Sequence, residues 1–125
     1  MKNILMIEDN KDQIMLSREF LESAGFSLEV VEVLPHNVSD PAFQTLVGRV
    51  NKFDMIIWDA DMSVNGSKLM TFDGHIQEVR KNFKGPMIAN SSEQNCREKQ
   101  LKAGCTHAVE RKGIDLLGLA EKLLN

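Results

Sequence analysis

The sequence predicts an α/β fold, a doubly wound parallel sheet of five strands with helices on both faces. Short apolar segments alternate five times with longer segments of helical character, which is typical of parallel strands joined by right-handed crossovers. The central segment Met55–Trp58 is wholly apolar and short, which favours a strand buried on both faces. A length of 125 residues, with 42% hydrophobic residues, suits a single domain over residues 1–125.

The first strand and helix follow local rules. Residues 3–7 are apolar and predict a strand. Asp12 fits the N-cap of the helix that follows, and Gly25 fits the position just after its end. Residues 28–34 are rich in Val and predict a second strand, whose two glutamates suit an edge of the sheet.

The second helix and the central strand come next. Asp40-Pro41 is a helix start, with a cap followed by proline in the first turn. The helical spacing of apolar side chains continues to Val50 through Phe43, Leu46 and Val47. After the central strand, residues 60–72 are rich in Ser, Asn and Gly and predict a long irregular segment.

The last part of the chain repeats the alternation. Asp73 is expected to cap a third helix, which ends before Gly85-Pro86. Residues 87–89 and 106–109 predict the fourth strand and a weak fifth strand. Between them, residues 93–103 have helical propensity but are polar nearly all round, which indicates a solvated face. Residues 114–124 form a clear amphipathic helix.

Composition excludes several classes of protein. The net charge is −3 and the pI about 5.6, without runs of Lys or Arg, so neither nucleic acid nor an anionic membrane is an expected partner. The sequence contains no apolar stretch long enough for a membrane span and no signal peptide at its start. Cys96 and Cys105 match no metal or redox spacing, which predicts packing thiols in a cytoplasmic protein.

Functional side chains gather at the carboxyl ends of the predicted strands, which in a parallel sheet meet at one edge. These residues are Glu8-Asp9, Asp59 with Asp61, Ser91-Ser92 and Arg111-Lys112. Neighbouring carboxylates repel one another unless a cation intervenes, and oxygen ligands with open water positions are what Mg²⁺ prefers. With a hydroxyl and an ammonium added, the set predicts a phosphoryl-binding site in which a carboxylate attacks in line.

The whole chain resembles the response-regulator receiver family of two-component signalling, and in particular its chemotaxis-regulator-like members. The most specific matches are ILMIEDN (residues 4–10), DMIIWDADM (54–62), PMIANSS (86–92), Ala24-Gly25 and Ala103-Gly104. The resemblance implies the flavodoxin-like strand order 2-1-3-4-5. It also implies a stand-alone signalling module and not an enzyme, since the last helix runs to Asn125.

The resemblance assigns roles to single residues. Asp59 would be the phosphoacceptor, which takes a phosphoryl group from a histidine kinase or phosphotransfer protein and signals to an effector protein of unknown identity. Asp9 would bind Mg²⁺ directly, Glu8 through water, and Asp59 and the main-chain carbonyl of Asp61 would complete the protein ligands. Ser91 would donate a hydrogen bond to a phosphoryl oxygen and swing toward it on activation.

The site cation has two candidates. Counted from Gly104, the lysine of the family falls on Arg111, whereas an adjustment of one residue in the strand puts it at Lys112. Lys112 is favoured and the choice stays open, because a guanidinium fork and an ammonium are not equivalent. Gly113 follows where the family usually has proline.

Other departures concern the switch and the neighbouring loop. Ala108 stands where the family usually has an aromatic residue in the fifth strand, and the chain contains no Tyr. Ser63 replaces a usual proline, and Phe72-Asp73-Gly74 comes several residues late, which predicts an enlarged loop beside the site. Asp61 and Glu93 are both acidic at positions that tune the lifetime of the phosphoryl group in the family, which predicts a strong dependence on Mg²⁺.

Two alternatives remain open. The first is a degenerate receiver that keeps the fold, does not respond to phosphate and acts as an adaptor. The absent aromatic residue and the displaced Lys112 favour it, while the set formed by Glu8, Asp9, Asp59 and Ser91 argues against it. The second is a small phosphatase-like hydrolase with Asp59 as nucleophile and Asp61 as a second acid, although the chain is short for such an enzyme.

Overall fold

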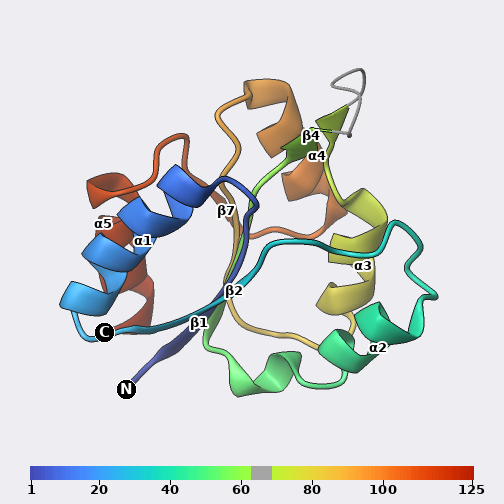
Figure 1. Ribbon diagram of the computed structural model, residues 1–125, viewed down its shortest axis with the longest axis horizontal. Helices are drawn as coiled ribbons and strands as arrows, with labels where there is room; N and C mark the ends of the chain where they lie inside the picture. The colour runs from blue at the N-terminus through green and yellow to red at the C-terminus, as the bar shows by residue number, and fades with distance from the viewer. Residues whose placement is uncertain (63–68) are drawn as a thin grey trace.

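A five-stranded parallel sheet forms the centre of the computed structural model, which describes residues 1–62 and 69–125 (Figure 1). The strands lie in the order β2 (Ser27–Val31), β1 (Asn3–Ile7), β3 (Met55–Trp58), β6 (Met87–Ala89) and β7 (His107–Ala108). Each adjacent pair is parallel. The predicted fold class and the strand order 2-1-3-4-5 are therefore confirmed.

Helices cover both faces of this sheet. Figure 1 shows α1 (Lys11–Ser23) and α5 (Ile114–Leu124) on one side of it. The other side carries α2 (Pro41–Val47), α3 (Asp73–Arg80) and α4 (Gln94–Ala103). A short 3-10 helix, η1 (Val50–Lys52), precedes β3. These two helical layers give the doubly wound arrangement that the alternation of segments predicted.

Strand residues divide between two hydrophobic cores because successive side chains point to opposite faces. In β1, Ile4 and Met6 pack toward α1 and α5, whereas Leu5 and Ile7 join the core under α2 and α3. All four side chains of β3 are buried, in agreement with a strand covered on both faces. Ile57 and Trp58 thus belong to different cores although they are neighbours in sequence.

The starts of α1 and α2 follow from local hydrogen bonds. The cap of α1 is Asn10, whose side chain accepts from the amide of Gln13, so the prediction of Asp12 is wrong. Asp12 lies instead in the first turn, where a carboxylate still favours the helix dipole. Asp40 caps α2 as predicted, and its side chain accepts from Ala42 N at 2.8 Å.

Two predicted elements are shorter in the structure. Strand β2 stops at Val31 and does not reach residue 34, because its neighbour β1 ends at Ile7 and offers no further partner. Helix α2 stops at Val47, and the apolar spacing continues into η1, where Val50 is fully buried. The burial of Val50 was therefore predicted correctly, whereas the continuation of the α-helix to this residue was not.

The segment after β3 is less irregular than expected. Asp61–Met62 and Leu69–Met70 pair as the antiparallel strands β4 and β5. The rest of the predicted enlarged loop, residues 63–68, lies outside the described residues. Helix α3 is capped by Phe72 in a left-handed conformation, with φ 61°, so Asp73 is its first residue and not its cap as predicted.

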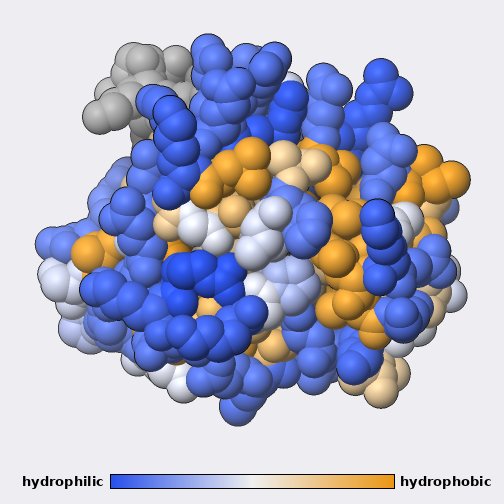
Figure 2. Space-filling model, turned by 180° about the vertical axis from the view of Figure 1, so that it is seen from behind, coloured by the Kyte–Doolittle hydropathy of each residue, from blue (hydrophilic) through white to orange (hydrophobic). Residues whose placement is uncertain are grey.

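Surface and core residues near the C-terminus fit an amphipathic α5. Leu116 and Ala120 are fully buried, while Leu117, Leu119 and Leu123 are partly buried against the same core. Seen from behind, the side of the molecule that carries α5 shows hydrophobic residues at the surface among hydrophilic ones (Figure 2). In the described part of the chain, no helix has the length and apolar character needed to cross a membrane.

Candidate phosphoryl and metal site

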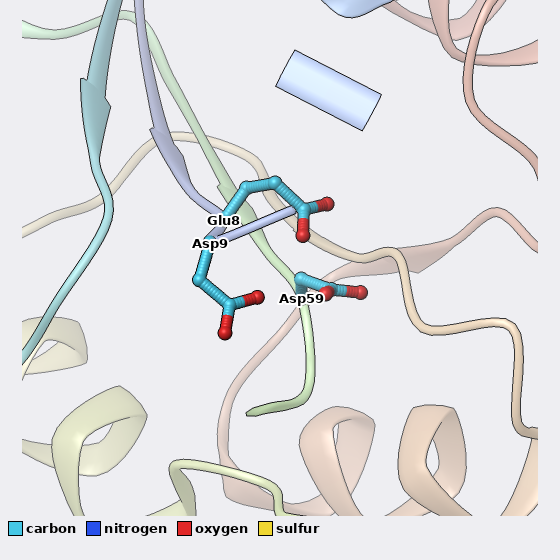
Figure 3. A group of neighbouring side chains, drawn as sticks. All are labelled: Glu8, Asp9 and Asp59. Atoms are coloured by element: carbon cyan, nitrogen blue, oxygen red, sulfur yellow. The ribbon is translucent and has the colours of Figure 1, made fainter. Parts of the chain in front are cut away.

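Three carboxyl groups converge at the carboxyl edge of the sheet. Glu8 and Asp9 directly follow β1, and Asp59 directly follows β3, the neighbouring strand. Figure 3 shows their side chains turned toward a common space. One carboxyl oxygen from each lies within 4.8 Å of the others. The structure therefore brings together three of the four residues that the sequence singled out as metal ligands.

The cluster borders a small cavity. It has a volume of about 10 Å³ and is lined by all three carboxylates together with Ala60 and Phe72. This space is about that of one water molecule, which is also the scale of a single ion. An all-oxygen donor set around a space of this size fits Mg²⁺, which binds few carboxylates and keeps several waters. Asp61 is the first residue of strand β4, and its side chain lies outside the described part.

Lys112 supplies the cation of the site. Its ammonium lies 2.9 Å from Glu8 Oε1 and 3.4 Å from Asp59 Oδ1, and its side chain is only 7% exposed. It also donates to the main-chain carbonyl of Asn90 at 3.1 Å. Arg111, the other candidate, is exposed to solvent. The geometry thus places Lys112, and not Arg111, among the carboxylates.

The charge state of Asp59 reflects this crowding. Burial, followed by the neighbouring Glu8 carboxyl, raises the pKa of its carboxyl from 3.8 to about 7. The nearby ammonium of Lys112 opposes the rise. Without a bound cation, Asp59 is therefore only partly ionised at neutral pH.

Ser91 lies at the carboxyl end of β6 and is buried. Its hydroxyl accepts a hydrogen bond from the amide of Glu93 at 3.1 Å, just before α4 begins. Arg97 donates to its main-chain carbonyl at 2.7 Å. Among the contacts of the described residues, none joins Ser91 to Asp59. Ser91 thus holds the segment before α4 in this conformation.

A wide hollow leads from the surface to the site. Its volume is about 530 Å³, and Asp59, Ser92 and Lys112 lie on its walls with Asn10 and Arg111. The hollow lies between the start of α1 and the segment before α5, whereas the small cavity lies beside Asp9. Asp59 therefore borders two spaces, the small cavity and this hollow.

Sequence reasoning missed two polar residues beside the site, Asn90 and Gln100. Both are fully buried. Gln100 of α4 donates to the main-chain carbonyls of Asp59 at 3.1 Å and of Thr71 at 3.3 Å, so the helix predicted to be solvated is tied to the segment that follows β3. The burial of Gln100 could not be predicted, because it lies in a helix whose sequence is polar. The burial of Asn90 could have been predicted, because it directly follows the apolar strand Met87–Ala89.

The two cysteines, Cys96 and Cys105, are free and buried. Burial raises the pKa of the Cys105 thiol to about 12, so it does not react as a thiolate near neutral pH. These findings agree with the prediction of packing thiols.

The fold and the edge cluster define a CheY-like receiver fold. CheY4 of Vibrio cholerae, a chemotaxis protein, matches this fold at 20% identity and a TM-score of 0.72 over 99% of both chains. The response regulator TrrA of Thermotoga maritima, solved with Mg²⁺ and beryllofluoride, has the same identity and TM-score over 99% of this chain and 100% of its own. A receiver domain of Methanospirillum hungatei matches at 19% identity and a TM-score of 0.71, over 98% of this chain and 94% of its own.

These similarities show the fold and extend over nearly the whole chain. No family model matches the sequence, and a search of curated proteins gives no match. The fold expected from the sequence resemblance is therefore confirmed by structure, while identities near 20% leave the activity to be argued from the site itself.

Proposed function

We propose that the chain is a receiver domain of a two-component or phosphorelay system, in which Asp59 accepts a phosphoryl group. The observation that carries the proposal is the convergence of Glu8, Asp9, Asp59 and Lys112 at one edge of a receiver-type sheet. Carboxylates and an ammonium in this arrangement can hold both a divalent cation and the oxygens of a phosphoryl group. A histidine kinase or phosphotransfer protein would be the donor.

The transfer uses Asp59 as the nucleophile. One of its carboxylate oxygens attacks the phosphorus of a phosphohistidine in line, the P–N bond breaks, and the imidazole leaves with the electron pair. Lys112, already 3.4 Å from Asp59, stabilises the negative charge on the phosphoryl oxygens. Ser91 would leave its contact with the Glu93 amide and donate its hydroxyl to one of these oxygens.

Mg²⁺ fits the remaining residues of the site. Asp9 and Asp59 would bind it directly, Glu8 through water, and the main-chain carbonyl of Asp61 would complete the set. When bound, the metal supplies positive charge to the phosphoryl oxygens. TrrA of Thermotoga maritima, which has this fold, was solved with Mg²⁺ and beryllofluoride, which supports the same site here.

Signalling by this chain would then depend on protein contacts. The surface hydrophobic residues on the α5 side suit a protein partner (Figure 2). In β7, the residue at the usual aromatic position is Ala108, which is exposed, so no ring is available there to follow Ser91. We expect any change on phosphorylation to pass through α4 and not through a fifth-strand aromatic residue.

The experiment is intact-mass measurement after incubation with acetyl phosphate and Mg²⁺, with Asp59→Asn as the control variant. One added phosphoryl group is expected on the unchanged protein, and none on Asp59→Asn or in the presence of chelator. Labelling of Asp59→Asn would place the acceptor elsewhere, and labelling undiminished by chelator would contradict the metal site. If the unchanged protein takes no label, the adaptor role that needs no phosphate replaces the proposal.

A further inference from the structure

Asn90 lies between the site and the segment that carries Lys112. It follows β6 directly, and its main-chain N–H donates to the main-chain carbonyl of Trp58, the last residue of β3, at 2.8 Å. The residue is fully buried. Its backbone is therefore fixed to the strand that leads into Asp59.

The side chain of Asn90 reaches across to the next strand and beyond it. Nδ2 donates to the carbonyl of Val109 at 2.8 Å and approaches that of Arg111 at 3.5 Å. The main-chain carbonyl of the same residue accepts from the Lys112 ammonium at 3.1 Å. Asn90 thus contacts the main chain just before Lys112 and also the far end of the Lys112 side chain.

In the described part of the chain, few other main-chain hydrogen bonds hold the segment that carries Lys112. The last backbone bond between β6 and the chain after β7 joins Val109 N to Ala89 O at 2.9 Å. Glu110 and Arg111 are exposed, and Gly113 has φ 79°, so the backbone changes direction immediately after the lysine. A lysine side chain has four rotatable bonds and loses considerable entropy when it is held in place.

The asparagine also carries a cost that its packing does not explain. Its Oδ1 is buried and has no hydrogen-bond partner among the described residues. A buried amide that is only half satisfied is less stable than an apolar side chain of similar size. Of the two ends of this side-chain amide, only Nδ2 makes hydrogen bonds among the described residues, and these bonds hold the segment before Lys112.

We propose that Asn90 is the positioning residue for Lys112. Its side-chain amide fixes the main chain before the lysine, and its main-chain carbonyl holds the ammonium between Glu8 and Asp59. The consequence for phosphoryl transfer rests on the proposed function, whereas the placement of Lys112 does not. Asn90 acts through Lys112 and touches neither the phosphoryl group nor the metal.

The first test measures how accessible the Lys112 amine is, by brief acetylation and peptide mass spectrometry. Asn90→Val keeps a residue suited to a strand end and removes the N–H donors of the side-chain amide. Its Lys112 should be acetylated about fivefold faster than in the unchanged protein, with exposed Lys122 as the internal reference, as the loss of one such hydrogen bond implies. Gln100→Met, which alters the other buried amide, should leave Lys112 protected.

Unchanged protection of Lys112 in Asn90→Val would overturn the proposal, as would equal loss of protection in Gln100→Met, since that result would mean general loosening. If Asn90→Val does not fold, Asn90→Ala is measured in the same way with the same two outcomes. Neither result depends on acetyl phosphate, so a failure of the proposed function remains distinguishable from a failure of this inference.

The second test asks whether Asn90 acts through Lys112. Once the unchanged protein is labelled by acetyl phosphate, the rate is compared among Asn90→Val, Lys112→Met and the double variant. Asn90→Val should slow labelling in the presence of Lys112 and have no further effect in the Lys112→Met background. Multiplicative losses in the double variant would show that Asn90 affects the site independently of the lysine and would overturn the proposal.

Discussion

The ammonium of Lys112 lies 2.9 Å from Oε1 of Glu8, and the two side chains are 7% and 1% exposed. The lysine also lies 3.4 Å from Asp59, so one positive charge is shared between two carboxylates. In the absence of a metal ion, this ammonium partly neutralises the site. A divalent cation that enters the cluster would therefore meet a positive charge already in place.

Lys112→Met should bind Mg²⁺ more tightly than the unchanged protein. Removal of one unit of positive charge within a few ångströms of the ligands favours a dication by about 1–2 kcal/mol near a surface, which is about a tenfold gain in affinity. Calorimetric titration with Mg²⁺ measures the change. Arg111→Met is the matched control, because that side chain is exposed, and should alter the affinity less than twofold. Weaker Mg²⁺ binding by Lys112→Met would mean that the lysine organises the carboxylates and does not compete with the metal.

Asp59→Asn should stabilise the metal-free protein at pH 8. Burial and the Glu8 carboxyl make the ionised form of Asp59 unfavourable and raise its pKa from 3.8 to about 7. An asparagine removes that charge with nearly the same shape, so we expect a gain of about 1–3 kcal/mol in the free energy of unfolding, discounted for partial exposure of the carboxyl. Chemical denaturation in the presence of chelator measures it.

The sign of the pH dependence follows from the same shift. Between pH 3.8 and about 7 the folded state holds a proton on Asp59 that the unfolded state has lost, so this contribution to stability is full below 3.8 and is lost as the pH rises to about 7. The advantage of Asp59→Asn should therefore be nearly constant from pH 8 to about pH 7 and shrink from there to pH 5. An advantage that is constant over this range would show that the gain does not arise from ionisation of Asp59.

Binding of Mg²⁺ should weaken on acidification for a related reason. A carboxylate must lose its proton to bind a metal, and the Asp59 carboxyl has a pKa of about 7 in the metal-free protein. We expect the dissociation constant for Mg²⁺ to rise about fivefold between pH 7 and pH 6 and to change little above pH 8. Titrations at constant ionic strength measure it. A dissociation constant that is flat from pH 8 to pH 6 would mean that Asp59 is ionised throughout.

The sequence predicted the sheet because its signals are local and repeated. Met55–Trp58 is apolar and buried on both sides, and the acidic residues that follow β1 and β3 meet because parallel strands end at the same edge. The start of α1 was predicted less well. Asn10 and Asp12 are both good caps, and only the hydrogen bond to Gln13 shows that the helix begins after Asn10.

Polar residues with long-range partners could not be predicted in the same way. Lys112 and Arg111 are adjacent basic residues, and their sequence does not show which of them turns inward. That choice depends on the conformation after β7, where Asn90 binds the main chain 19 residues away from it in sequence, at Val109. The burial of Gln100 likewise depends on how α4 packs against the end of β3, which its polar sequence does not indicate.

Gln100→Met should destabilise the protein, although it replaces a polar residue with an apolar one of similar length. The Gln100 amide is the donor to the carbonyls of Asp59 and Thr71, at 3.1 and 3.3 Å, and both lose this partner in the variant. Loss of a partner for buried carbonyls costs about 1–3 kcal/mol. The substitution also removes Oε1 of Gln100, which is buried without a partner among the described residues, and this gain offsets part of the cost. We expect a net loss of about 1–2 kcal/mol in the free energy of unfolding.

The matched control is Gln94→Met, at the exposed start of the same helix, which should change stability by less than about 0.5 kcal/mol. Fluorescence of Trp58 provides a second measurement. The centroid of its ring lies 6.1 Å from that of Phe72, and the two residues adjoin in sequence Asp59 and Thr71, whose carbonyls Gln100 binds. The spectrum should shift in Gln100→Met and stay unchanged in Gln94→Met. If Gln100→Met proved as stable as the unchanged protein with an unshifted spectrum, this amide would not hold α4 to the end of β3, because the loss of its two hydrogen bonds would then leave the packing around Trp58 intact.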